Sequence, residues 1–256
     1  MTSKPASFWT RYANPTAFQR LSNQIAPLAG GAAIAFIALG LWFGLVASPA
    51  DYQQGDTVRI MYVHVPAAWM AMACYTSMAI ASVAGFVWKH PLADVAAKST
   101  APIGATFTAL ALVTGALWGQ PTWGTWWVWD ARLTSVLVLF FMYLGYMALW
   151  SAIDEPTRAA RIAAVACLVG FINVPIIKFS VDWWNSLHQP ASVIRANGPS
   201  IDGSMLRPLL LMAFGYTLAY VWLLFVNMSA ELAERRAARL LAGARPTATL
   251  VAEPAE

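Results

Sequence analysis

The sequence has too few charged residues to cover the surface of a soluble protein of its length. Charged types make up 11% of its 256 residues, whereas apolar types make up 59%. A soluble domain usually carries about 25% charged residues. Lipid removes this requirement, because it replaces water around most of the surface of a membrane protein. The composition therefore predicts an integral membrane protein, and it argues against nucleic acid as the partner of a chain with a net charge of +4.

Motifs of soluble redox and nucleotide chemistry are also missing. The two cysteines, Cys74 and Cys167, stand alone within apolar stretches, so they form neither a CxxC pair nor a CxxCH haem-attachment motif. We interpret both as small apolar core residues. The sequence contains no Walker A motif, and we therefore do not expect the chain to hydrolyse ATP by itself.

Six apolar stretches are long enough to cross a bilayer, which takes roughly 20 residues per helix. They cover residues 26–47, 63–88, 100–118, 133–152, 160–179 and 206–227. We therefore predict an all-α membrane domain over residues 26–227, between an N-terminal tail of residues 1–25 and a C-terminal tail of residues 228–256. The C-terminal tail is expected to begin as a charged helix, Glu231 to Leu241, and to end in a disordered stretch rich in Pro, Ala and Thr.

Lysine and arginine are distributed unevenly between the two sides that this arrangement defines. Eleven lie in the two tails and in the second and fourth connections, and five lie on the other side. Because cytoplasmic segments carry the excess of Lys and Arg, we predict that both termini are cytoplasmic. The connections at residues 118–135 and 179–205 then face outward, which means the periplasm in a Gram-negative cell.

The third connection is rich in tryptophan. Five of the thirteen tryptophans lie in it, namely Trp118, Trp123, Trp126, Trp127 and Trp129. Tryptophan is normally enriched at membrane interfaces, but such a belt does not account for five in so short a segment with Gly119, Pro121 and Gly124 between them. Gly and Pro indicate a shaped loop over residues 118–135. Its rigid aromatic rings indicate a platform for a large planar apolar ligand.

Two of the three histidines lie at the outward end of the predicted membrane domain. His64 stands in a His-x-Pro sequence at the start of the second stretch, with Pro66 suited to the first helical turn. His188 stands in another His-x-Pro sequence in the long outward connection, whereas His90 lies among charges on the cytoplasmic side. Either outward histidine alone fits a structural role better. As a pair beside an aromatic platform, they indicate the two axial ligands of a haem iron.

Haem also carries propionates, which bind Arg or Lys. Arg132 adjoins the tryptophan-rich connection and Arg59 lies five residues before His64, so these two rank first among the five outward basic residues. Ordinary snorkelling to the membrane interface would also explain both. Asp130 is expected to position Arg132 or the loop backbone, because two histidines leave no need for a carboxylate ligand.

The segment Trp123–Ser135, which reads WGTWWVWDARLTS, resembles the WWD signature of bacterial haem-handling proteins of cytochrome c maturation. Within that group, the six helices and the segments around residues 61–69 and 183–190 resemble the CcmC family. The resemblance implies transient, non-covalent binding of haem b at the periplasmic face of the bacterial inner membrane, with His64 and His188 as axial ligands. It also implies transfer of haem to the chaperone CcmE, which docks on the tryptophan-rich loop, beside the ABC transporter subunits CcmA and CcmB and the small membrane protein CcmD.

The residues alone leave two other functions open. A permease unrelated to haem needs polar groups along a path through the helices, and the helix interiors carry only mild ones such as Ser77, Thr106 and Thr114. A b-type electron-transfer subunit needs histidines within the helices to hold haem inside the bilayer, whereas this pair is expected at the outer boundary. We therefore predict a haem-binding and haem-transfer protein rather than an enzyme.

Overall fold

The computed structural model describes residues 13–184, 186–189 and 192–243. Within these residues the regular elements are all helical, and no β-strand is formed. Six helical segments are long and apolar enough to cross a membrane. The predicted all-α fold with six spans is therefore confirmed, and the chain is a multi-pass membrane protein. The expected disordered end, residues 244–256, lies outside the described residues.

The elements follow one another with short connections. The α-helices are α2 (Pro15–Trp42), α3 (Met61–Trp88), α4 (Ala93–Trp123), α5 (Ala131–Ala152), α6 (Pro156–Gly170), α7 (Asn173–Trp183) and α8 (Gly203–Gly243). A π-helical segment, η1 (Phe43–Ala47), continues α2, and a 3-10 segment, η2 (Asp56–Ile60), leads into α3.

The first and last helices extend beyond the predicted spans. α2 begins at Pro15 rather than at residue 26, because the Asn14 side chain accepts a hydrogen bond from the Thr16 N–H at 2.8 Å and Pro15 occupies the start of the helix. α8 continues without interruption to Gly243 and includes the predicted charged helix. Parts of both predicted tails are therefore helical extensions of membrane spans.

The fifth span is broken into α6 and α7 at Phe171 and Ile172, whereas a single helix was predicted over residues 160–179. Pro175 explains the break, because proline cannot donate a backbone hydrogen bond and its ring clashes with the carbonyl four residues earlier. That carbonyl belongs to Phe171. It accepts from the Val174 N–H at 3.0 Å instead, and the buried Asn173 side chain donates to the Ser135 carbonyl at 2.8 Å.

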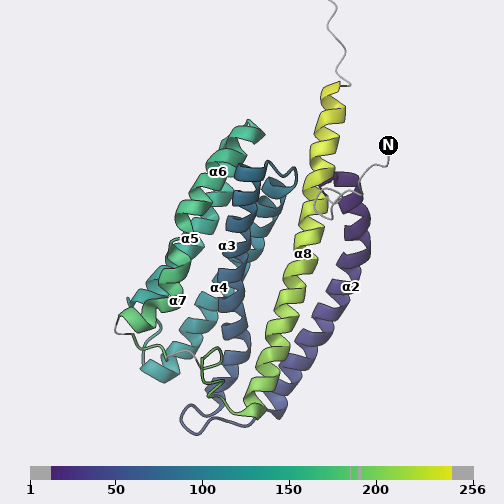
Figure 1. Cartoon of the computed structure of the whole chain (residues 1–256). Coiled ribbons are helices and arrows are strands. Elements are labelled where there is room, and N and C mark those ends of the chain that lie inside the picture. Colours follow the sequence, from purple (N-terminus) through teal and green to yellow (C-terminus); the bar gives the residue numbers. More distant parts are fainter. Residues whose placement is uncertain (1–12, 185, 190–191, 244–256) are drawn as a thin grey trace, which may run out of the picture.

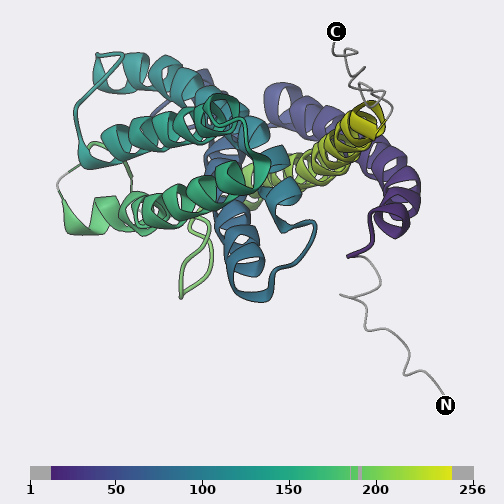
Figure 2. The same ribbon diagram turned by 90° about the horizontal axis from the view of Figure 1, so that it is seen from above.

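Helices α3 to α7 form one group, and α2 and α8 lie side by side at its edge (Figures 1 and 2). α8 joins the two parts, since it also packs against α3 and α4. The largest fully buried side chains are Tyr62, Tyr75, Tyr143, Met78, Leu139, Leu209 and Met212. The Tyr143 hydroxyl donates to the Ala71 carbonyl at 2.7 Å, which satisfies a polar group deep in this core.

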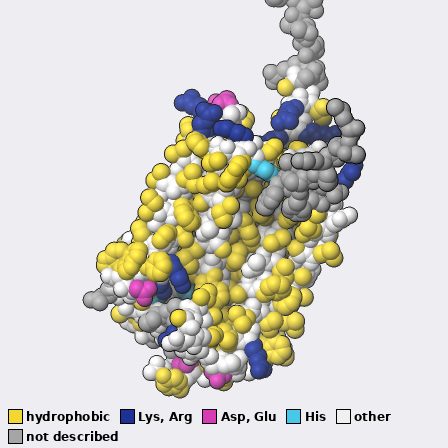
Figure 3. All heavy atoms as spheres, in the orientation of Figure 1, with side chains coloured by type: hydrophobic (Ala, Val, Ile, Leu, Met, Phe, Trp, Pro, Cys, Tyr) yellow, Lys and Arg dark blue, Asp and Glu magenta, His cyan; other side chains and the backbone are white. Residues whose placement is uncertain are grey.

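The outer faces of the helices carry many exposed apolar side chains. Leu28, Ile34, Val113, Val169 and Phe214 are all more than half exposed. Figure 3 shows apolar side chains over the middle of one face, with most Lys and Arg near its ends. Water would not favour so much apolar surface, but lipid does.

Successive spans run in opposite directions, so the connections between them lie at two opposite ends of the molecule (Figure 1). The start of α2 and the end of α8 lie at one end. The start of α3, the end of α4, the start of α5 and the end of α7 lie at the other, which we call the histidine end because His64 and His188 lie there.

An ion-pair cluster joins α8 to α4 at the end of the bundle opposite the histidine end. Glu231 accepts from Lys98 at 2.7 Å and from Arg235 at 2.8 Å, and Arg235 also donates to Asp94 at 2.7 Å. The Lys98 ammonium lies 5.0 Å from the centre of the Trp150 ring. Because several charges share partners, this network stabilises the packing of α8 more than an isolated surface pair would.

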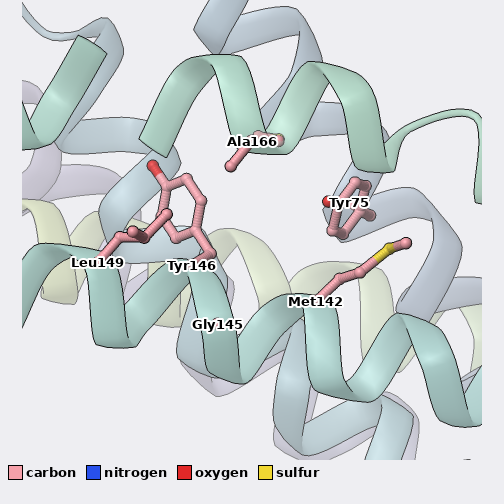
Figure 4. A pocket seen from close by; sticks show the side chains of 7 residues that line it. Tyr75, Met142, Gly145, Tyr146, Leu149 and Ala166 are labelled. Atoms are coloured by element: carbon pink, nitrogen blue, oxygen red, sulfur yellow. The ribbon is translucent and has the colours of Figure 1, made fainter. Parts of the chain in front are cut away.

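A cavity of about 350 Å³ lies between α5 and α6, with Tyr75 of α3 at its wall (Figure 4). Its other lining residues are Met142, Gly145, Tyr146, Leu149, Ala166 and Cys167. None of the predicted haem-site residues lines this cavity, and its walls are mostly apolar. It therefore offers neither histidines for a haem nor a charged path for an ion.

Candidate functional site

His64 lies in the first turn of α3 and packs against α4. Its Nδ1 atom is 3.1 Å from the hydroxyl oxygen of Thr114, and its ring meets the Trp118 ring edge-to-face at 5.7 Å between centres. A Cβ atom on Gly115 would come within 3.0 Å of the His64 ring. Residues 114, 115 and 118 share a face of α4, as three- and four-residue spacings require. This face forms a cradle for the imidazole.

The network around Thr114 fixes the tautomer of His64. The Thr114 hydroxyl donates to the Leu110 carbonyl at 2.6 Å. Because a hydroxyl has a single proton, its oxygen must accept from His64, so Nδ1 carries the imidazole proton. The lone pair of the neutral ring is then on Nε2, which is the form that binds a metal.

The sequence suggested that Pro66 occupies the first turn of its helix, but the structure places it further along. The segment η2 and the first residues of α3 precede it, so Pro66 lies inside the helix and is buried. His64, rather than Pro66, is the residue at the helix start.

His188 lies in the connection between α7 and α8 and is held by Asp130. Its Nδ1 atom is 3.1 Å from the Asp130 carboxylate, and its backbone N–H donates to the Ser186 hydroxyl at 3.1 Å. The Trp123 ring meets it edge-to-face at 4.9 Å between centres. Burial lowers the pKa of His188, and hydrogen bonding to Asp130 raises it without full compensation. His188 is therefore a neutral imidazole that donates from Nδ1 and keeps its lone pair on Nε2.

Asp130 has two tasks in the structure. It begins α5 as its N-cap, where it accepts from the Leu133 N–H at 2.7 Å, and it accepts from Ser186 at 2.5 Å as well as from His188. Burial raises the pKa of Asp130, but these hydrogen bonds outweigh burial and hold the pKa below its ordinary value. The group is thus a carboxylate.

The sequence left two alternatives for Asp130, which were to position Arg132 or to position the loop backbone. Asp130 does organise the local backbone, through the cap of α5. Within the described residues its side chain bonds to Leu133, Ser186 and His188, and not to Arg132. Of the two alternatives, these hydrogen bonds favour the loop backbone over Arg132.

His64 and His188 lie at the same end of the bundle although they are far apart in the sequence, His64 in the first turn of α3 and His188 between α7 and α8. Each histidine meets one tryptophan from the last turns of α4, Trp118 for His64 and Trp123 for His188. No hydrogen bond joins either Nε2 to the residues that the structure describes, so both lone pairs are available.

The prediction of a loop over residues 118–135 is wrong at both ends. α4 continues through Trp123, with Pro121 inside it, and α5 begins at Ala131. Gly124 ends α4 with a left-handed conformation (φ 77°), which glycine adopts without steric cost. Only residues 124–130 are non-helical, and Trp118 and Trp123 are held on a helix rather than on a loop.

The remaining tryptophans lie in the segment of residues 124–130, which we call the tryptophan loop. Trp126 is 58% exposed and Trp129 is 75% exposed. Trp127 is half-buried and packs edge-to-face on Trp129 at 5.5 Å between ring centres. Its buried Nε1–H has no partner among the described residues. The tryptophan loop thus presents two exposed indoles and one free donor.

The two arginines singled out from the sequence each bind a neighbouring element. Arg59 pairs with Asp56 at 3.0 Å and donates to the Gly44 and Leu45 carbonyls at 3.2 and 2.7 Å, which fastens η1. Arg132 donates to the Ser180 hydroxyl of α7 at 3.2 Å. Toward the described residues, Nη2 of Arg59 and Nη1 of Arg132 make no hydrogen bond, so each guanidinium keeps N–H groups for an anion.

Several residues around the histidines could not be identified from the sequence. Gln54 accepts from the Trp118 indole N–H at 2.8 Å and so fixes the ring that faces His64. The sequence identified Thr114 only as a mildly polar residue in an apolar helix, and it gave no indication of a role for Ser186 or Gly115. The spacing of Thr114 and Trp118 does place them on one helical face, which was the one usable signal.

The donor set suits a haem better than a bare metal ion. The part of the chain that the structure describes contains no group of three or more His, Cys, Asp or Glu side chains that could hold a metal ion. A haem brings its own equatorial nitrogens and needs only axial ligands, which two imidazoles with free Nε2 atoms supply. The buried indole N–H of Trp127 in the tryptophan loop has no partner among the described residues and is a further donor at this end of the bundle.

Comparisons with known proteins identify the family. A family model described as "Heme exporter protein C" (CcmC) matches residues 8–242. The chain is 60% identical to Heme exporter protein C of Bradyrhizobium diazoefficiens over 88% of this chain and 85% of the relative. It is 48% identical to Heme exporter protein C of Haemophilus influenzae, over 89% of this chain and 93% of the relative.

A relative outside the bacteria is also similar. The chain is 51% identical to a putative cytochrome c biosynthesis ccmC-like mitochondrial protein of Marchantia polymorpha, over 68% of this chain and 74% of the relative. With a family match over nearly the whole chain and this level of identity, the chain belongs to the CcmC family of haem exporter proteins.

Proposed function

We propose that this protein binds haem at the periplasmic face of the bacterial inner membrane and transfers it to the haem chaperone CcmE. The observation that carries the proposal is the matched setting of His64 and His188. Each is fixed through Nδ1, leaves Nε2 free and packs against one tryptophan of α4. A role in handling haem for cytochrome c maturation also agrees with the names of the relatives.

Within this proposal the side chains of the site divide the work. His64 and His188 bind the iron of haem b, non-covalently and transiently, and Trp118 and Trp123 keep the two imidazoles oriented. Haem supplies a planar iron complex with two open axial positions. Arg59 and Arg132 hold the propionates through the N–H groups that their structural partners leave free.

The tryptophan loop has a different task in the proposal. Trp126 and Trp129 have exposed rings, and interface residues of this type often contribute most of the binding energy of a complex. We assign CcmE docking to them, with Trp127 as their support. The excess of Lys and Arg at the other end supports cytoplasmic termini. There the ABC transporter subunits CcmA and CcmB and the membrane protein CcmD complete the export complex.

The test uses three histidine variants of the full chain in detergent or lipid nanodiscs. His64→Ala and His188→Ala should each reduce bound haem, measured by the Soret absorption, because each removes one axial ligand. Added imidazole should partly restore haem in either variant. His90→Ala is the matched control and should bind like the wild type, since His90 lies at the opposite end of the bundle. Unchanged spectra in both ligand variants would refute the proposed site.

A further inference from the structure

The two proposed axial histidines are held by chemically different partners. His188 donates from Nδ1 to the carboxylate of Asp130, whose side chain is only 6% exposed. His64 donates from Nδ1 to the neutral hydroxyl of Thr114. Both distances are 3.1 Å, and the two acceptors differ in charge. The Ser186 hydroxyl also lies 3.3 Å from Nδ1 of His188.

Neither partner is free to change its role. Asp130 is held in place by the Leu133 N–H at 2.7 Å and by the Ser186 hydroxyl at 2.5 Å. The Thr114 hydroxyl has its proton engaged with the Leu110 carbonyl at 2.6 Å. The carboxylate therefore stays opposite one imidazole, and the hydroxyl can only accept from the other.

The charge of the acceptor affects how strongly an imidazole binds a metal. A carboxylate that accepts from one ring nitrogen raises the basicity of the other nitrogen and strengthens its bond to the metal. Hydrogen bonds to an ionised acceptor are also about twice as strong as those between neutral groups. His188 should therefore be the stronger electron donor of the pair, and His64 the weaker.

On the basis of the proposed function, we infer that Asp130 and Thr114 are positioning residues that make the two iron–histidine bonds unequal. His188 is the strong ligand, which keeps haem on the protein. His64 is the weak ligand, which opens first when haem is handed over. This inequality gives the site a defined order of release without a conformational change in the helix bundle.

The first variants separate this role from the structural role of Asp130. Asp130→Asn keeps the N-cap of α5, because asparagine caps helices about as well as aspartate. Its one oxygen accepts from Leu133, and its amide NH2 replaces the oxygen that accepts from His188, so both the charge and the acceptor opposite His188 are lost. We expect haem affinity to fall about 10–100-fold, the usual effect of losing a partner of a metal ligand. Thr114→Val should cost less than tenfold, and Thr114→Ser should restore the wild-type affinity.

A matched control tests whether removing the charge of any aspartate at a helix start lowers haem affinity. Asp202 accepts from the Ser204 N–H at 2.8 Å near the start of α8 and bonds to no histidine. Asp202→Asn should bind haem like the wild type. If Asp130→Asn fails to accumulate, Asp130→Ser takes its place, because serine also caps helices and carries no charge opposite His188. It should lower haem affinity in the same direction.

Double variants identify the histidine through which each partner acts. In a His64→Ala background, Asp130→Asn should still lower haem affinity, because His188 remains to be weakened. In a His188→Ala background the same change should have no further effect. Thr114→Val should show the opposite dependence. His188→Ala alone should lose more haem than His64→Ala.

The reduction potential of the bound haem is a measurement that a purely structural role of Asp130 would leave unchanged. A strong donor favours ferric iron, so Asp130→Asn should raise the potential, and a tenfold preferential loss of ferric affinity corresponds to 59 mV for one electron. Electron paramagnetic resonance should keep a low-spin ferric signal, which shows that both histidines still bind. Thr114→Val should raise the potential by less.

The outcomes distinguish a failure of this inference from a failure of the proposed function. If His64→Ala and His188→Ala bind haem like the wild type, the site itself is wrong. If both lose haem but Asp130→Asn matches the wild type in affinity and potential, the inequality is wrong. The inequality is also wrong if Thr114→Val lowers haem affinity as much as Asp130→Asn or more. It is equally wrong if Asp130→Asn still lowers haem affinity in the His188→Ala background.

Discussion

Gly115 is the position where the smallest change should have a large effect on the site. In Gly115→Ala, the new Cβ would lie 3.0 Å from His64 Cε1 and 3.5 Å from Nδ1. Carbon atoms prefer a separation of about 3.5–4.0 Å. The imidazole must therefore move away from α4 by roughly 0.5 Å or more.

A shift of this size breaks the hydrogen bond that fixes His64. The bond from Nδ1 to Thr114 is 3.1 Å long, so the displacement lengthens it to about 3.6 Å, a separation that no longer counts as a hydrogen bond. A ligand held outside about 0.5 Å of its working geometry binds poorly. We expect haem affinity to fall by about tenfold, or about 1.4 kcal/mol.

The free energy of unfolding should fall by about 0–2 kcal/mol, the balance of two opposing effects. Crowding a packed position typically costs about 1–3 kcal/mol, while replacing glycine by alanine within a helix returns about 1 kcal/mol. The assay combines haem titration, followed by the Soret absorption, with thermal unfolding of the protein without haem. Gly145→Ala in α5 is the matched control, because a Cβ there meets nothing within 4 Å.

Two results would refute the reasoning about Gly115. One is wild-type haem affinity in Gly115→Ala, which would mean that the ring is not confined between the helices. The other is an equal loss of affinity in Gly145→Ala, which would mean that any added methyl group in a membrane helix disturbs the site.

Two further predictions concern surfaces away from the iron ligands. Trp126→Ala and Trp129→Ala each remove an exposed ring, so haem affinity should stay within about tenfold of the wild type. Transfer of haem to purified CcmE should fall more steeply, since interface tryptophans often contribute about 2 kcal/mol or more. Equal losses in both assays would contradict separate roles. Glu231→Gln removes the anion shared by Lys98 and Arg235 and should lower the unfolding free energy by about 1–3 kcal/mol without changing haem affinity. An unchanged thermal transition would mean that the ion-pair cluster contributes nothing.

The number of spans could be predicted because bilayer thickness sets a minimum length for each apolar stretch. The ends of the helices could not, because hydropathy does not report capping. The sequence Asn14–Pro15 is a helix start by its side-chain chemistry, although polar residues follow it. In the same way, Gly124 ends α4, and the tryptophans before it remain helical despite Pro121.

The histidine pair could be proposed from the sequence because few residue types bind haem iron and only three histidines are present. Their partners were not accessible. Thr114 bonds to His64 only because α3 and α4 pack together, and Ser186 joins Asp130 only because the α7–α8 connection folds back over the start of α5. Such contacts depend on how the helices pack, which could not be deduced from the residue pattern of one sequence.

The separation between held and exposed tryptophans bears on how the proposed transfer of haem would proceed. The rings of Trp118 and Trp123 are fixed on a helix against the two histidines, whereas Trp126 and Trp129 project from the tryptophan loop. A partner that docks on the exposed rings need not disturb the rings that orient the ligands. Docking affinity and haem affinity can then be set independently, so tight docking does not require weak haem binding. Release would instead depend on the weaker of the two iron bonds, which we assign to His64.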